Sequence, residues 1–176
     1  PEKFTAATFH QFCLAILRGH LSAAGLPAGF QIALPEIVEE IAKELWPHKT
    51  ARERKQILWE ISRFKTVCFR DECPPQAGSL NAALRSRGLL DFDDLILETV
   101  RLLENNRGAC EAVRSIYREI CVDEYQDINA VQYALLKILT GPDGRLTAIG
   151  DPNQAIYGFR GSDVRLFQTF PQDFPG

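Results

Sequence analysis

Apolar residues recur at helical spacing along most of the chain, beginning near the N-terminus. After Thr8, the apolar side chains at positions 9, 12, 13, 16 and 17 fall on one face of a helix. Thr8 is suited to cap the start of this helix, and Gly25 can close its end in a left-handed conformation. The first 28 residues are therefore expected to hold one helix that packs against a core.

The middle of the chain has a helical pattern throughout and no strand pattern. Pro35 suits the first turn of one helix, and Thr50 with Glu53 forms the T-x-x-E pattern that starts another. A shorter helix is expected over about 79–87. Residues 29–88 are therefore predicted to form an all-helical insert.

After Gly88 the pattern changes to helices that alternate with two short apolar runs. Helices are expected at about 91–103, 109–117 and 127–140, and the apolar runs at 120–122 and 146–149 predict strands. Each predicted strand is followed by acidic residues. A strand, a helix and a second strand in this order favour a parallel sheet. We therefore predict a helix-rich α/β fold in which segments 1–28 and 89–176 form one unit around the insert.

Composition and charge exclude several classes of protein. With 45% apolar and 24% charged residues in 176, the chain can bury a core, and its net charge of −3 excludes a uniformly basic nucleic-acid coat but not a local basic face. No apolar run reaches the length that spans a bilayer and no secretion leader is present, so we expect no membrane and a cytoplasmic location. Five cysteines, an odd number, do not indicate a disulfide framework.

Two neighbouring carboxylates are the first candidates for chemistry. Asp123 and Glu124 directly follow the predicted strand 120–122, which places them at the carboxyl edge of the sheet, where α/β folds bind ligands. One carboxylate there can hold Mg²⁺, and its neighbour can orient or deprotonate an attacking water. The alternative is an ordinary strand end followed by a helix cap.

Four sequence blocks together resemble one family. They are T-F-H-Q-F-C at 8–13, L-D-F-D-D-L at 90–95, V-D-E-Y-Q-D-I-N at 122–129 and G-D-P-N-Q-A-I-Y-G-F-R-G-S-D at 150–163. In this order they resemble the motifs of superfamily 1 DNA helicases of the UvrD/Rep/PcrA type, whose patterns include D-E-x-Q-D and G-D-x-x-Q-x-I-Y-x-[WF]-R-G-A. The resemblance implies a partial RecA-like motor domain, of the P-loop NTPase type, with a helical insert.

On the nucleotide side, the resemblance implies ATP and Mg²⁺ as cofactors. Asp123 would be the carboxylate associated with Mg²⁺, Glu124 the base for the attacking water, and Gln154 the contact to the γ-phosphate. The same crevice would hold Gln126, Asp127 and Arg160, with Arg160 coupling the nucleotide site to DNA.

On the DNA side, the resemblance places Thr8, Phe9 and His10 along the path of a single strand, with Tyr157 and Phe159 as aromatic contacts. Aromatic residues that alternate with glycines on a loop can offer ring faces to unstacked bases. Two alternatives stay open, because His10 can be an ordinary structural histidine and the aromatic residues can be core packing.

The predicted insert has a locally basic segment. Between positions 43 and 70, eight Lys and Arg stand against three Glu, a local charge of +5. Lys49, Arg52 and Lys55 flank a predicted helix start, and phosphate contact there agrees with the insert of the family, which lies against duplex DNA. The alternative is a solvated helix face.

The resemblance implies a DNA helicase that uses ATP to move along single-stranded DNA, with 3′-to-5′ polarity, and that acts at junctions between single and double strands. No Gly-Lys-Ser or Gly-Lys-Thr of a phosphate-binding loop occurs, so we expect an internal fragment that is inactive alone. Phe159 stands where the family commonly has Trp, and the insert is short for the family. Alternatives are a non-catalytic nucleic-acid-binding or regulatory module, and the helicase part of a RecB/AddA-like helicase-nuclease.

Overall fold

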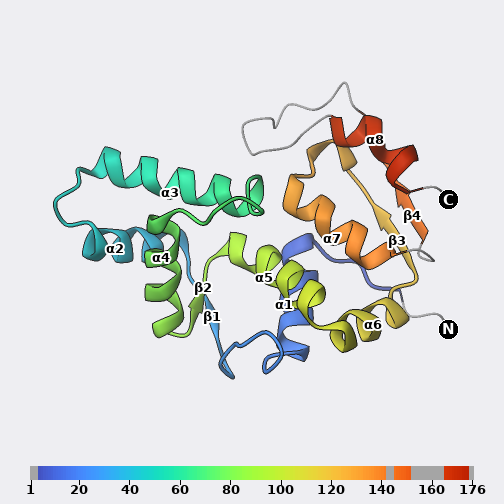
Figure 1. Ribbon diagram of the computed structural model, residues 1–176, viewed down its shortest axis with the longest axis horizontal. Helices are drawn as coiled ribbons and strands as arrows, with labels where there is room; N and C mark the ends of the chain where they lie inside the picture. The colour runs from blue at the N-terminus through green and yellow to red at the C-terminus, as the bar shows by residue number, and fades with distance from the viewer. Residues whose placement is uncertain (1–3, 142–144, 152–164, 175–176) are drawn as a thin grey trace.

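The computed structural model describes residues 4–141, 145–151 and 165–174 (Figure 1). In these residues the helices are α1 (Phe9–Gly19), α2 (Pro35–Leu45), α3 (Ala51–Thr66), α4 (Pro75–Ser86), α5 (Phe92–Asn105), α6 (Arg107–Ile116), α7 (Ala130–Thr140) and α8 (Arg165–Asp173). The strands are β1 (Gln31–Ile32), β2 (Leu89–Leu90), β3 (Glu119–Val122) and β4 (Arg145–Ala148), and a single 3₁₀ turn covers Tyr125–Asp127. The predicted helix-rich α/β class with parallel strands is confirmed.

The described strands form two parallel pairs. β1 pairs with β2, with Gln31 opposite Leu89, and β3 pairs with β4, with Val122 opposite Ala148. The first pair joins the chain just before α2 to the chain just after α4. The second pair brings Asp123 and Glu124, which follow β3, and Asp151, which follows β4, to the same edge.

Several helix starts have the local chemistry that the sequence predicts. Pro35 is the first residue of α2. Thr50 and Glu53 form a reciprocal capping box at the start of α3, and the Asp91 carboxylate accepts the Asp94 backbone N–H to cap α5. These bonds satisfy backbone N–H groups that have no partner within the helix.

Some boundaries differ from the prediction. The first helix ends at Gly19, and Gly25 adopts its left-handed conformation in the turns that follow rather than in a helix cap. The helix expected over 127–140 begins only at Ala130, because Asn129 forms a capping box with Gln132. The insert expected over 29–88 contains the short strand β1 besides its helices, because its backbone pairs with the chain that leaves the insert.

The apolar residues are buried in three clusters. α2, α3 and α4 surround the first, which includes Ile41, Phe64 and Leu80. α1, α5, α6 and α7 surround the second, and α8 packs with β3 and α7 over the third. Figure 1 shows α2–α4 at one end of the molecule, β1 and β2 between α4 and α5, and β3 and β4 toward the opposite end.

A buried ion cluster joins α3 to the start of α5. The Lys65 ammonium lies 2.6 Å from an Asp91 oxygen and 2.8 Å from an Asp94 oxygen, and its side chain is fully buried. Burial alone would lower the pKa of Lys65, but the two carboxylates outweigh it and raise the pKa. Burial raises the pKa of Asp94 to about 6, and the nearby Asp91 carboxylate, which shares the same ammonium, acts in the same direction. Lys65 is therefore a structural residue, and its charge does not belong to the basic face counted from the sequence.

Helix α8 is anchored to the 3₁₀ turn by an aromatic contact and to α7 by polar and ionic contacts. The ring of Phe170 packs edge-on against Tyr125, with 5.2 Å between the ring centroids. Asp173 accepts a hydrogen bond from the Tyr133 hydroxyl and forms an ion pair with Lys137, at 2.8 Å. Hydrogen bonds from Lys137 and Tyr133 lower the pKa of Asp173 to about 2.

Replacing Asp173 with Asn should loosen α8. Loss of the charged acceptor costs about 1 kcal/mol, so amide hydrogen exchange in α8 should accelerate about fivefold at neutral pH. Because the folded pKa is depressed, this stabilisation is present above the unfolded pKa near 4 and is lost as pH falls through about 2. Replacing the exposed Gln168 with Ala is the control, and equal exchange rates for both variants would contradict the anchor.

Candidate functional site

The candidate site lies where the chain turns after β3. Asp123 and Glu124 are both exposed, and an Asp123 side-chain oxygen accepts the Glu124 backbone N–H at 2.9 Å. Glu124 has a φ of +52°, a left-handed conformation that no other described residue besides glycine adopts. Such a backbone costs about 1–3 kcal/mol and is typical of functional sites.

Backbone hydrogen bonds hold this turn against the end of β4. The Ile149 N–H donates to the Val122 carbonyl at 2.8 Å, and the Tyr125 N–H donates to the Ile149 carbonyl at 2.9 Å. Ile149 therefore lies between the residues that flank the two carboxylates. The sharp bend at Glu124 lets the chain pass around the strand end.

The turn also brings Gln126 between the two strand ends. Its side-chain Nε2 donates to a Glu124 carboxylate oxygen at 2.5 Å, and its Oε1 accepts the Asp151 backbone N–H at 3.1 Å. Gln126 is 3% exposed. The structure thus places the sequence blocks 122–129 and 150–163 in direct contact through Gln126 and Asp151.

Asp127 is the last polar residue that this turn places near Asp123 and Glu124. It is half-buried at the end of the 3₁₀ turn, and its Oδ1 atom is buried without a hydrogen-bond partner in the part of the chain that the structure describes. A buried carboxylate oxygen without a partner is costly, so it marks a place where a donor is expected to bind. Of the predicted nucleotide-side residues, Gln154 and Arg160 lie outside the described residues.

The donor set at this turn fits a magnesium ion held together with phosphates. Asp123 offers an exposed carboxylate, and no group of three or more His, Cys, Asp or Glu residues is arranged for a metal within residues 4–141, 145–151 and 165–174. Mg²⁺ commonly takes one or two carboxylates and keeps waters and substrate phosphates as its other ligands. The arrangement suits that mode better than a closed protein cage.

The predicted DNA residues of the first block lie at the start of α1. The Thr8 hydroxyl accepts the Gln11 N–H in a capping box, and the half-buried Phe9 packs against two of the apolar clusters. The His10 ring packs edge-on against Phe92, at 5.8 Å between centroids. Thr8 therefore has a capping role, and Phe9 and His10 have packing roles, in addition to any contact with DNA.

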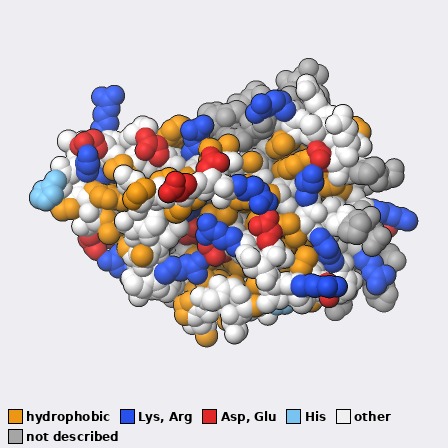
Figure 2. Space-filling view, viewed as in Figure 1, with side chains coloured by type: hydrophobic (Ala, Val, Ile, Leu, Met, Phe, Trp, Pro, Cys, Tyr) orange, Lys and Arg blue, Asp and Glu red, His pale blue; other side chains and the backbone are white. Residues whose placement is uncertain are grey.

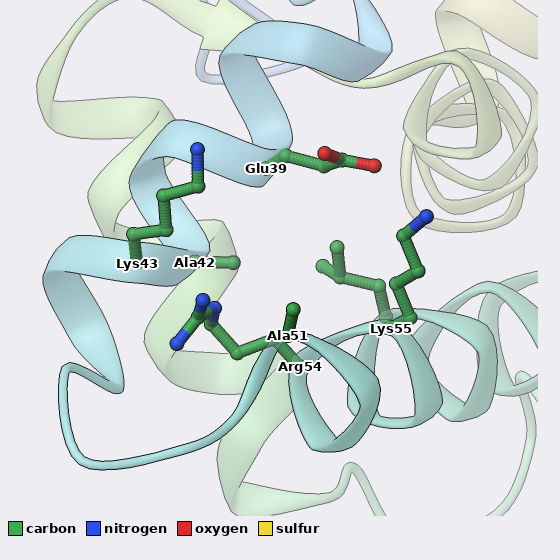
Figure 3. A pocket seen from close by; sticks show the side chains of 7 residues that line it. Glu39, Ala42, Lys43, Ala51, Arg54 and Lys55 are labelled. Atoms are coloured by element: carbon green, nitrogen blue, oxygen red, sulfur yellow. The ribbon is translucent and has the colours of Figure 1, made fainter.

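The predicted basic residues stand at the start of α3. Arg52 and Lys55 are exposed, and Lys49 forms an ion pair with Glu53 at 3.2 Å. On the face shown in Figure 2, Lys and Arg side chains alternate with Asp and Glu over much of the surface. Figure 3 shows Lys43, Arg54 and Lys55 around a small hollow between α2 and α3, with Glu39 on its rim.

The sequence reasoning missed the contact between Gln126 and the end of β4. A Cβ atom on Gly150 would lie 2.3 Å from the Gln126 Oε1, so only glycine leaves room for the amide. The signal was present as a glutamine two residues after Glu124 and a glycine directly after the second apolar run. The aromatic residues Tyr157 and Phe159 lie outside the described residues.

Comparison with known proteins identifies relatives along the whole chain. The family model described as UvrD/REP helicase N-terminal domain matches residues 1–175. DNA helicase II of Escherichia coli strain K12 is 32% identical over 96% of this chain, and the ATP-dependent DNA helicase PcrA of Staphylococcus aureus strain Mu50 is 30% identical over 99%. The ATP-dependent DNA helicase Rep of Buchnera aphidicola is 30% identical over 96%.

The matches cover only part of each relative. The chain spans 26% of the length of the Escherichia coli and Staphylococcus aureus proteins and 27% of the Buchnera protein. Among the helices that the structure describes, none combines the length and the apolar character that crossing a membrane requires.

Proposed function

Because this chain belongs to the UvrD/REP helicase family, we propose that it forms part of an ATP-dependent DNA helicase, in which it activates water for ATP hydrolysis and lines the DNA path. The observation that carries this proposal is the exposed pair Asp123 and Glu124 at the carboxyl edge of β3 and β4. Ligands of open α/β sheets bind at this edge. Segments 1–28 and 89–176 would belong to the motor domain and residues 29–88 to its insert.

On the nucleotide side, each proposed role follows from the chemistry of the side chain. Asp123 would hold Mg²⁺, which when bound with ATP offsets the negative charge of the phosphates. Glu124 would accept a proton from the attacking water, and Gln154 would contact the γ-phosphate. Asp127 offers its buried oxygen to a donor in the same crevice, and Arg160 would connect this crevice with the DNA.

On the DNA side, we propose three groups of contacts to a single strand and its junction with a duplex. Thr8, Phe9 and His10 stand at the start of α1, where backbone N–H groups favour phosphate. Tyr157 and Phe159 would stack on bases. Lys49, Arg52 and Lys55 would contact duplex phosphates from the start of α3.

The experiment that tests the proposal uses the full-length parent protein. Single-stranded DNA should stimulate its ATP hydrolysis, and it should unwind duplexes with a 3′ tail in preference to those with a 5′ tail. A non-catalytic module would bind DNA without hydrolysing ATP. A helicase-nuclease would also shorten the labelled strand. We further propose that the protein acts in the cytoplasm, where its DNA substrate and ATP are both available.

The two kinds of DNA contact should respond differently to salt. Replacing Phe159 with Ala should weaken single-strand binding by about 1–3 kcal/mol with little change in salt dependence. Replacing Lys49, Arg52 and Lys55 together should flatten the slope of log K against log salt by up to about 0.9 per lost contact. Salt titrations of both variants against wild type measure this, and an unchanged slope in the triple variant would remove α3 from the DNA path.

A further inference from the structure

The orientation of the Gln126 amide is fixed by its two partners. A backbone N–H only donates, so the Asp151 N–H requires the amide oxygen at 3.1 Å. The amide nitrogen therefore faces Glu124, whose carboxylate accepts its hydrogen at 2.5 Å. A leucine of similar size could make neither bond, and a glutamate would present a second carboxylate to Glu124. The amide is thus the group that satisfies both neighbours at once.

Burial and the neighbouring glycine both favour this arrangement of the amide. Gln126 is 3% exposed, so neither end exchanges its partner for bulk water. Gly150 provides the room, since a Cβ there would lie 2.3 Å from the amide oxygen and 3.0 Å from the Tyr125 backbone nitrogen. Real side chains essentially never show an approach of 2.3 Å, so the amide of Gln126 would have to move.

We propose that Gln126 is a positioning residue for Glu124, holding its carboxylate at the strand edge and tying it to the backbone that begins the 150–163 block. This inference rests on the proposed function, because it gives Glu124 the part of the base. It goes further by making the position of the base depend on the end of β4. A displacement of Asp151 would then be transmitted to Glu124 through one side chain.

A double-mutant cycle in the full-length protein tests this. Gln126→Leu should lower kcat for ATP hydrolysis about 10- to 100-fold, the usual effect of removing a partner that orients a catalytic group, with the KM for ATP nearly unchanged. In a Glu124→Gln background, single-turnover rates should show no further loss from Gln126→Leu, because the residue acts through Glu124. A merely structural part would produce the same loss in both backgrounds, and that result would overturn the proposal.

A second variant keeps the test valid if Gln126→Leu folds poorly. Gly150→Ala should also lower kcat, because its Cβ displaces the amide, whereas Gly78→Ala should leave kcat unchanged, since nothing lies within 4 Å of a Cβ at position 78. Wild-type kcat in Gly150→Ala would contradict the proposal.

A third measurement does not depend on activity. In Gln126→Leu the Asp151 amide loses its acceptor, so its hydrogen exchange should accelerate, while Glu124→Gln should leave it protected. Unchanged exchange in Gln126→Leu would show that the contact does not exist in solution. If Glu124→Gln itself keeps full turnover, Glu124 is not the base and the proposed function fails. If instead Gln126→Leu causes the same loss in both backgrounds, only the positioning role of Gln126 fails.

Discussion

Replacing Glu124 with Gln in the full-length protein is expected to lower kcat for ATP hydrolysis by at least about 100-fold while ATP binding persists. Glutamine keeps the shape of the side chain and its hydrogen-bond acceptor, but it cannot take a proton from water. The neighbouring contacts explain why binding should survive, since the backbone bonds that hold the turn against β4 do not involve this side chain.

The measurement combines steady-state ATP hydrolysis in the presence of single-stranded DNA with nucleotide binding at equilibrium. Glu119→Gln is a matched control, because Glu119 begins the strand that precedes Glu124. Its exposed carboxylate pairs only with Arg145, at 3.2 Å, among the described residues. We expect this control to retain wild-type turnover. If Glu124→Gln hydrolyses ATP as fast as the control, Glu124 is an ordinary strand-end carboxylate.

The second large effect is on stability. Replacing Lys65 with Ala should lower the free energy of unfolding by about 3–5 kcal/mol, because it leaves the carboxylates of Asp91 and Asp94 without their buried counter-ion. For a domain of this size the melting temperature should fall by about 6–20 °C. Thermal unfolding followed by circular dichroism measures the shift. Lys55→Ala, on the exposed face of the same helix, should melt like wild type.

A combined variant separates charge from packing at this cluster. Lys65→Met together with Asp91→Asn and Asp94→Leu removes the buried charges and keeps an asparagine to cap α5. Since apolar replacements of buried ion groups are often neutral or stabilising, most of the lost stability should return. A combined variant as unstable as Lys65→Ala would show that packing of the lysine stem, rather than charge, dominates.

The parts of the fold that depend on neighbours in sequence were predictable. Capping residues such as Thr50 and Asp91 act within one helical turn, so their pattern fixes where α3 and α5 begin. The two short apolar runs marked β3 and β4 for the same reason, because a buried strand is a local run of apolar residues. The carboxylates of the candidate site could therefore be located from sequence.

The parts that depend on distant contacts were not predictable in the same way. Lys65 has the pattern of a solvated helix residue, and only its approach to the start of α5 shows that it is buried. The hydrogen bond between Gln126 and Asp151 joins two sequence blocks, and their separation along the chain does not show which of their residues face each other. Gly25 is left-handed as its type suggests, yet α1 ends earlier, at Gly19.

The short pairing of β1 with β2 has a consequence for protein engineering. Adjacent strands lie about 4.8 Å apart, so the chain enters the segment that holds α2, α3 and α4 at Gln31 and leaves it close by, at Leu89. Doubling the length of a flexible loop costs only about 0.6 kcal/mol, so cassettes of very different size could be grafted there without displacing the β3–β4 edge. A graft that removes α3 would also have to neutralise Asp91 and Asp94, because it removes their counter-ion Lys65. These two carboxylates therefore make the rest of the protein more sensitive to the deletion of α3 than to the insertion of new residues.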